Sequence, residues 1–147
     1  MFKHILIPTD GSATADKAVQ AGIEFAHDTK ARVTAFIAMP IYPTPTRSQL
    51  VSGTYENIND YEKRVLADGA KRLATAVKSG EAAGVQVECD VAMSDDPYAA
   101  IIESAQRNEC DLIFMASHGR RGFQELLHGS QTHEVLTRSK IPTLVFR

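Results

Sequence analysis

The stretch HILIPTDGS, residues 4–12, decides the fold of this chain. Its apolar half stops at the turn-rich cluster TDGS, which predicts a buried strand that runs into a loop. Small and branched apolar residues then recur at helical spacing from Ala15 to Ala26, and Ser12 is a suitable N-cap for that helix. Residues 32–39 are again apolar and β-prone, so the chain begins with a strand, a helix and a second strand.

The same alternation of strand and helix patterns continues to the end of the chain. Further strands are expected at 85–91, 112–116 and 142–146, and further helices from 58 to about 80 or 84, from 97 to about 108, and from 130 to about 136. The strand at 85–91 alternates strictly between apolar and polar side chains, which indicates a sheet edge with one face in water. Asp96 is expected to cap the helix that Pro97 begins. This order predicts an α/β fold with a doubly wound parallel sheet and helices on both faces.

One connection is unusually long. Pro40, Pro43 and Pro45 prevent the second strand from continuing, so residues from about 40 to 55 are expected to form a loop. Loops of this length are usually functional or mobile.

Composition limits the class of protein. The 147 residues are 44% hydrophobic and 23% charged, which is typical of one globular domain, residues 1–147. The net charge of −2 argues against a general nucleic-acid or membrane-surface binder, because both need a basic excess. The sequence shows neither a signal peptide nor an apolar run long enough to span a membrane, so a cytoplasmic location is expected. Cys89 and Cys110 are interpreted as small buried apolar residues in a reducing compartment.

Two loops carry candidates for a ligand site at the carboxyl ends of the strands, residues 8–12 and residues 116–122 with Gly129 and Ser130 beyond them. Glycine lets a backbone approach an anion closely, and a helix beginning at Ser130 would direct free N–H groups at a phosphate. The alternative is that the glycines only form turns and that Ser130 is only an N-cap. Asp10 either binds a ribose hydroxyl or Mg²⁺ through water, or caps the first helix.

Other chemistries are less well supported. Neither G-x-x-x-x-G-K-[ST] nor G-x-G-x-x-G occurs, and no G-x-S-x-G elbow is present to form a hydrolase. His118, His128 and His133 lack the spacing and the cysteine partners of a zinc site. Adjacent arginines such as Arg120 and Arg121 either clamp phosphates or are solvated surface charge. No catalytic residue and no metal site is therefore predicted.

The run ASHG, residues 116–119, followed after nine residues by Gly129 and Ser130, resembles the nucleotide loop G-x2-G-x9-G-[ST] of the universal stress protein family. Residues 5–12 resemble that family's first strand and loop, and residues 135–145 are similar to its last helix and strand. The resemblance extends over the whole chain. Ala116 stands where the motif has its first glycine, and Gln131 stands where the family often has a small or apolar residue.

The resemblance implies a five-stranded sheet of order 3-2-1-4-5, a site for ATP or a related nucleotide (AMP or ADP, with or without Mg²⁺), and a homodimer formed through the last strand. Ile37 would pack against the adenine, and Arg120 is a further phosphate neighbour. The other implied site residues are Pro8, Thr9 and Asp10 beside the ribose and phosphates, Met115 and Ala116 with backbone contacts, and Gly119, Gly129, Ser130 and Gln131 around the phosphates.

The function expected from these features is that of a cytosolic stress-response protein with a regulatory or sensing role. Phosphate donors without an identifiable general base predict at most slow ATP hydrolysis. The alternatives are an interaction module of the same fold that binds no nucleotide, and a slow phosphatase that uses Asp10 and His118. The apolar final strand, residues 143–146, is the expected dimer edge, because an unprotected apolar edge is an association site.

Overall fold

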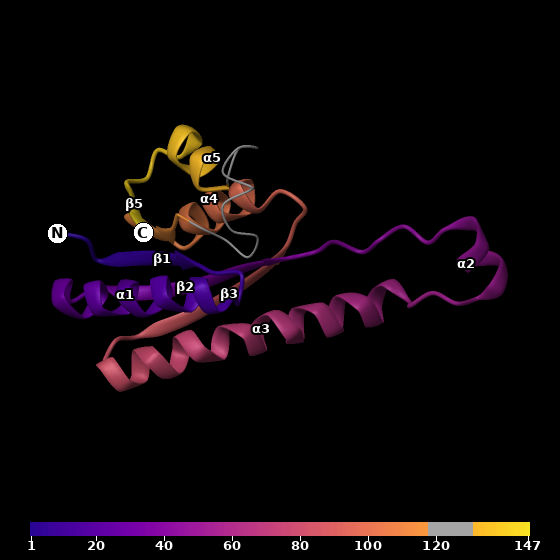
Figure 1. Cartoon of the computed structure of the whole chain (residues 1–147), viewed down its shortest axis with the longest axis horizontal. Helices are drawn as coiled ribbons and strands as arrows, with labels where there is room; N and C mark the ends of the chain where they lie inside the picture. Colours follow the sequence, from indigo (N-terminus) through magenta and orange to yellow (C-terminus); the bar gives the residue numbers. More distant parts are fainter. Residues whose placement is uncertain (118–130) are drawn as a thin grey trace.

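The structure is a computed structural model that describes residues 1–117 and 131–147. Within these ranges five parallel strands form one sheet in the order β3-β2-β1-β4-β5 (Figure 1). The elements in chain order are β1 (His4–Pro8), α1 (Ala13–Thr29), β2 (Arg32–Met39), α2 (Arg47–Ser52), α3 (Ile58–Ala83), β3 (Val87–Met93), α4 (Pro97–Arg107), β4 (Leu112–Ala116), α5 (Gln131–Arg138) and β5 (Thr143–Phe146). The predicted fold class and strand order are confirmed.

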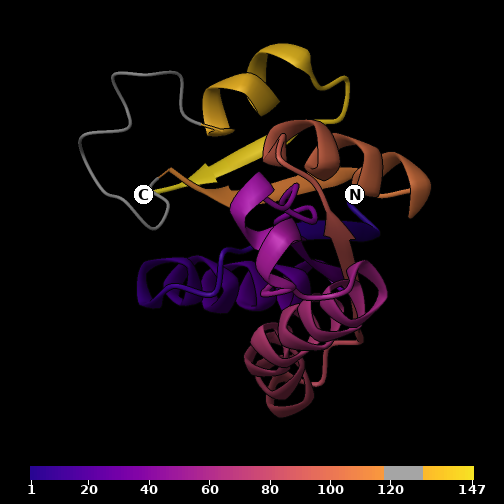
Figure 2. The same cartoon turned by 90° about the vertical axis from the view of Figure 1, so that its right-hand side faces the viewer.

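The helices cover the sheet on both faces, with α1 and α3 on one side and α4 and α5 on the other (Figure 2). Because side chains alternate along a strand, Ile5 and Ile7 lie in the core beneath α1 and α3, whereas Leu6 between them lies in the core beneath α4 and α5. All three are at most 1% exposed. The central strand β1 is therefore buried on both faces, as its unbroken apolar sequence predicts.

The edge strand β3 differs from its prediction in the role of its polar side chains. Asp90, expected in water, accepts hydrogen bonds from Ser104 Oγ at 2.5 Å and Asn108 Nδ2 at 3.0 Å, and it pairs with Arg107. These donors all come from α4 and its C-cap, so the polar face of β3 holds that helix. Conversely, Cys89 is exposed, and its interpretation as a buried residue is wrong, whereas Cys110 is buried as expected. The cause is the edge position, which leaves one side of β3 uncovered.

The long connection after β2 contains a helix, so the expectation of a loop throughout is also wrong. Thr46 Oγ1 accepts from Gln49 N at 3.3 Å while Gln49 Oε1 accepts from Thr46 N at 2.8 Å, which is a capping box that starts α2. Gly53, with φ of +69°, ends the helix. Together with the start of α3, this segment projects far from the rest of the molecule (Figure 1).

No helix in the described ranges combines the length and the apolar character needed to cross a membrane. Even the long helix α3 alternates buried and charged positions along its length.

Candidate functional site

The pairing of β1 with β4 ends before their carboxyl ends, at the place where a doubly wound sheet has its ligand crevice. The two strands are paired over Ile5 with Leu112 and Leu6 with Ile113. By contrast, β1 stays paired with β2 as far as Pro8, and β4 stays paired with β5 as far as Ala116. The chain order reverses between β1 and β4, and ligands of doubly wound sheets bind at such a switch point. The loop after β1 and the described start of the second predicted loop, Ala116 and Ser117, therefore lie at this switch point.

Proline accounts for the separation. The carbonyl of His4 accepts from Asp111 N at 2.9 Å, on the β4 side, whereas Thr9 N donates to Phe36 O at 2.8 Å, on the β2 side. Polar backbone groups alternate in direction along a strand, so position 8 points toward β4, as position 4 does. Pro8 has no N–H, and the donor that would continue the pairing with β4 is missing.

The loop after β1 is fixed by its own side chains. Thr9 Oγ1 accepts from Gly11 N at 3.1 Å, and Asp10 Oδ1 accepts from Ser12 N at 2.9 Å. Ser12 Oγ in turn accepts from Ala15 N at 3.1 Å and caps α1, as predicted. Of the two roles considered for Asp10, helix capping is thus performed by Ser12, and the half-buried Asp10 carboxylate lies within an Asx turn beside the crevice.

Arg72 of α3 is a charged neighbour of this loop that the sequence interpretation missed. A side-chain carbon on Gly11 would lie 3.3 Å from Arg72 Cδ, so the arginine stem lies against the loop backbone. Gly11 also has a φ of +75°, which glycine adopts without strain. The Arg72 guanidinium pairs with Asp68 one turn earlier, at 3.0 Å. No local sequence signal connects two residues so far apart in the chain.

On the other side of the crevice, Thr132 joins the start of α5 to the end of β4. Its hydroxyl donates to Ala116 O at 3.0 Å, and the residue is 9% exposed. Ser117 N donates to Phe146 O at 2.8 Å, while Ser117 Oγ is buried and has no hydrogen-bond partner among residues 1–117 and 131–147. Sequence interpretation had not assigned a role to Thr132 or to the Ser117 hydroxyl. Buried hydroxyls are normally paired, so Ser117 Oγ is a group available to a ligand.

The side chain of Gln131 has a structural partner. Its Oε1 accepts from Tyr98 N at 2.7 Å, at the start of α4. Asp96, expected to cap that helix, makes no side-chain cap hydrogen bond, so the expected cap is wrong and the glutamine carboxamide occupies the role. The predicted contact of Gln131 with phosphates would therefore depend on its backbone.

The remaining predicted residues divide into two groups. Ile37 and Met115 are 1% and 5% exposed and lie in the cores on opposite faces of the sheet, so they offer a ligand their backbone rather than their side chains. Gly119, Arg120, Gly129 and Ser130 lie outside the described residues, as does His118. In residues 1–117 and 131–147, no three His, Cys, Asp or Glu side chains gather as a metal site would require.

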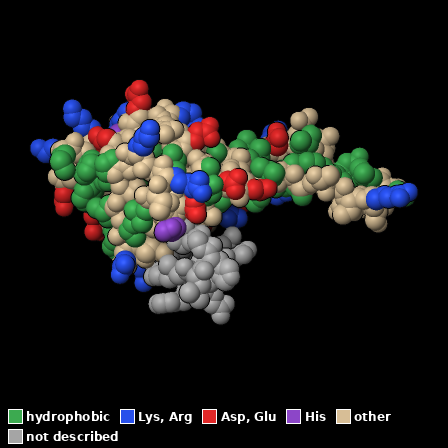
Figure 3. Space-filling model, turned by 90° about the horizontal axis from the view of Figure 1, so that it is seen from above, with side chains coloured by type: hydrophobic (Ala, Val, Ile, Leu, Met, Phe, Trp, Pro, Cys, Tyr) green, Lys and Arg blue, Asp and Glu red, His purple; other side chains and the backbone are tan. Residues whose placement is uncertain are grey.

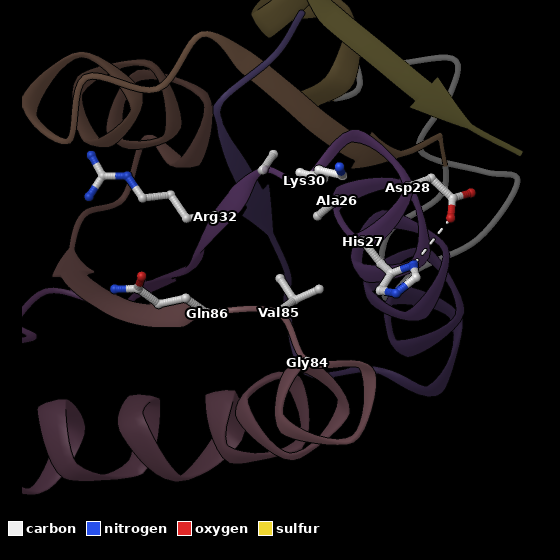
Figure 4. A pocket seen from close by; sticks show the side chains of 9 residues that line it. Ala26, His27, Asp28, Lys30, Arg32, Gly84, Val85 and Gln86 are labelled. Atoms are coloured by element: carbon white, nitrogen blue, oxygen red, sulfur yellow. Dashed lines mark hydrogen bonds and ion pairs between the residues drawn. The ribbon is translucent and has the colours of Figure 1, made fainter.

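A separate hollow of about 590 Å³ opens at the amino ends of the strands, away from the crevice (Figure 4). It lies between the end of α1, the start of β2 and the turn before β3. Arg32 and Gln86 point away from the paired His27 and Asp28, and all four side chains are exposed. The hollow therefore lacks a converging set of groups.

The model of the universal stress protein family matches residues 1–147. The chain belongs to the universal stress protein family. Universal stress protein YxiE of Bacillus subtilis is 29% identical over 150 residues, covering 100% of both chains. Universal stress protein MJ0531 of Methanocaldococcus jannaschii is 29% identical over 147 residues, which cover all of this chain and 83% of the relative.

Solved structures show the same universal stress protein fold. Protein MJ0577 superimposes with a TM-score of 0.77 and 26% identity, covering 99% of this chain and 95% of that one. A universal stress protein crystallised in complex with cAMP gives a TM-score of 0.75 at 22% identity, covering 99% and 97%. One from Archaeoglobus fulgidus in complex with dAMP gives 0.63 at 14% identity, covering 100% and 98%. The last two likenesses support the fold assignment.

Proposed function

We propose that this universal stress protein binds ATP, or a related nucleotide such as AMP or ADP, in the crevice between β1 and β4. Its role would be regulation or sensing in a cytoplasmic stress response. The observation that carries the proposal is the early end of the β1–β4 pairing, at the strand ends that lead into the two loops resembling the family's first loop and nucleotide loop. The cAMP and dAMP complexes of the neighbouring structures support an adenine nucleotide as ligand.

The described residues suit the sugar and phosphate part of such a ligand. Thr9 and Asp10 lie in a fixed loop at the crevice, and Asp10 is placed to accept from a ribose hydroxyl or to hold Mg²⁺ through water. Arg72 adds a positive charge beside that loop, and Ser117 Oγ adds a free hydroxyl on the β4 side. Gly129 and Ser130, with Gly119 and Arg120, would hold the phosphates through backbone N–H groups and charge.

The base would lie against backbone rather than side chains. Met115 and Ala116 would offer peptide groups at the end of β4, whereas Ile37 lies within β2, paired with Val91 of β3, and its side chain is buried. Backbone donors and acceptors discriminate among bases by hydrogen bonding, which suits an adenine-specific pocket.

Dedicated catalysis is not part of the proposal. The crevice offers donors to phosphates, but the residues that line it in the described ranges supply no base paired to a nucleophile. Any hydrolysis of ATP would therefore be slow. Rapid multiple turnover would instead favour the alternative, a hydrolase that uses Asp10 and His118.

A homodimer through β5 is the proposed assembly. In the described part of the sheet, β5 pairs with β4 on one side and forms the edge on the other. Its residues, Thr143–Phe146, are half-buried within one chain, and an edge of this kind accepts a second strand.

Calorimetric titration with ATP and with AMP, with and without Mg²⁺, tests the site. Gly129→Asp places a carboxylate where the phosphates are proposed, so binding should be lost. Ser130→Ala removes one hydrogen bond to a charged group, worth about 1.5–3 kcal/mol or roughly a 10- to 100-fold loss of affinity.

The matched control is Gly53→Asp, because Gly53 has no neighbour within 4 Å of the added side chain and aspartate tolerates its φ of +69°. Melting temperatures are measured beside the affinities, because Ser130→Ala would also remove the N-cap that the sequence offers as an alternative role for Ser130, worth roughly 1 kcal/mol of stability. A folded Gly129→Asp protein with wild-type affinity would place the nucleotide elsewhere. A wild-type protein that binds neither nucleotide would favour the alternative of an interaction module.

A further inference from the structure

The segment that projects from the molecule carries most of its exposed large hydrophobic side chains. We call residues 40–66 the arm; it comprises the coil after β2, α2 and the first turns of α3 (Figures 1 and 3). Apart from Met1 and Leu136, every exposed large hydrophobic side chain of the described residues lies on it. They are Ile41, Leu50, Val51, Tyr55, Ile58 and Leu66. Val51 is 84% exposed.

Internal contacts hold the arm in shape without covering these side chains. The hydroxyl of Tyr61 donates to the carbonyls of Pro40 and Ile41, each at 3.1 Å, and Tyr42 OH donates to Glu56 O at 2.6 Å. The rings of Tyr42 and Tyr61 meet edge to face, with centroids 5.3 Å apart. Arg64 adds two hydrogen bonds to the Glu56 carboxylate, at 2.8 and 3.0 Å.

Two physical features indicate that such a surface needs a partner. Isolated helices shorter than about 12–15 residues are marginal in water, and α2 has six residues, none of them buried. Contiguous exposed apolar surface in soluble proteins usually marks an interaction site.

The charged side chains of the arm indicate which kind of partner would fit it. Arg47 is the only Lys or Arg among residues 40–57, and the outer end of the arm carries a basic side chain (Figure 3). At the inner end, Glu62 lies midway between Ile58 and Leu66 at successive four-residue steps, so the three share one face of α3. Neither Arg47 nor Glu62 makes an ion pair within the described chain. The arm thus has an unpaired cation at its tip. Its base carries Asp60, Glu62 and Lys63, none in an ion pair within the described residues, so the unpaired charge there is net negative, and apolar side chains lie between the two ends.

A second arm in antiparallel orientation satisfies this pattern. A two-fold axis between two arms places the tip of each against the base of the other, so the same contact forms twice. We propose that the arm is a self-association surface, covered by the arm of a second copy of this chain, with Arg47 of each copy opposite Glu62 of the other. This contact is separate from the one proposed at β5, because the arm and β5 lie at opposite ends of the molecule (Figure 1).

Light scattering after size exclusion, at micromolar concentration and low salt, tests the proposal on the full chain. The double variant Leu50→Glu/Val51→Glu places charges in the contact and should halve the mass of the wild-type assembly. The matched control is Leu136→Glu, which changes an exposed leucine on α5 and should keep the wild-type mass. If both contacts form, a four-chain assembly becomes a dimer in the variant, and if only the arm pairs, a dimer becomes a monomer. If only β5 pairs, wild type and variant are both dimers, so the response of the variant distinguishes failure of the arm contact from failure of the β5 contact.

Charge exchange tests the antiparallel geometry. Arg47→Glu and Glu62→Arg should each shift the assembly toward the smaller species, and the combined variant should restore it, because the pair is then re-formed with the signs reversed. Circular dichroism establishes that each variant is folded. A monomeric wild-type protein, or a Leu50→Glu/Val51→Glu variant with the wild-type mass, would overturn the proposal. Loss of association without restoration in the combined variant would overturn the pairing of Arg47 with Glu62.

Discussion

Replacing Pro8 with alanine tests whether a missing backbone donor keeps the crevice open. The backbone direction at position 8 is toward β4, so Pro8→Ala supplies an N–H that can continue the pairing beyond Leu6 and Ile113. The new hydrogen bond stabilises the folded state by about 0.5–1.5 kcal/mol. Loss of proline raises the entropy of the unfolded chain and costs about 0.4–1 kcal/mol. The two effects nearly cancel, so the free energy of unfolding should change by less than about 1 kcal/mol.

Nucleotide affinity should respond far more than stability. Continued pairing draws the ends of β1 and β4 together, and the crevice narrows where the nucleotide is proposed to bind. We expect Pro8→Ala to weaken ATP binding by an order of magnitude or more, whereas urea unfolding stays close to wild type. The control is Pro45→Ala, which makes the same change in the coil of the arm. A folded Pro8→Ala protein that binds ATP as tightly as wild type would refute the reasoning, because the missing donor would then have no effect on the site.

Three further predictions concern the framework. Thr132→Val removes the hydrogen bond to the end of β4 and should lower the free energy of unfolding by about 1–2 kcal/mol, with roughly 2–4 °C in Tm for each kcal/mol. The control is Thr137→Val, on the exposed side of the same helix, and equal melting temperatures of the two variants would contradict the role of Thr132. A thiol reagent should label Cys89 in the native protein and Cys110 only on unfolding, because burial raises the pKa of the latter to about 11; two rapidly labelled thiols in the native protein would contradict this. Burial also lowers the pKa of His4, so the folded state binds a proton at His4 less readily than the unfolded state, and the free energy of unfolding should fall as pH drops below about 6.5. His4→Gln should flatten the dependence of the urea midpoint on pH between about 7 and 5. A dependence as steep as in wild type would assign this pH effect to other groups.

The sheet was predictable because local sequence and burial agree along it. The strands β1, β2 and β4 are apolar runs bounded by turn residues, and all three begin and end where the sequence predicts. Helix ends were predictable where the signal is local, as with Ser12 before α1 and Gly84 after α3. The helix α2 was missed because three prolines dominate its surroundings, although the capping pair Thr46 and Gln49 is a local signal that could have found it.

The site was only partly predictable, because its contacts join distant segments. Periodicity shows which face of a strand is buried, but it does not show that Arg72 lies against Gly11 or that Thr132 reaches the carbonyl of Ala116. The unexpected cap of α4 also depends on a contact between distant segments. Asp96 has the ideal residue type for a cap, yet Gln131, brought near by tertiary packing, makes the hydrogen bond. The residue type at a helix start therefore determines the capping hydrogen bond less strongly than the side chains that the fold brings near that helix.

The departure of this chain from the family's motif at Ala116 has a simple physical reading. Glycine is favoured where φ is positive, because most other residues are strained there. In the described residues, the non-glycine positions with positive φ are Lys30 and Glu109, so Ala116 is not among them. It is instead the last residue of β4, in register with Phe146, and it uses its carbonyl to accept from Thr132. The backbone of β4 thus accommodates alanine without strain, and the added methyl group bears on the room left for a ligand in the crevice rather than on the fold.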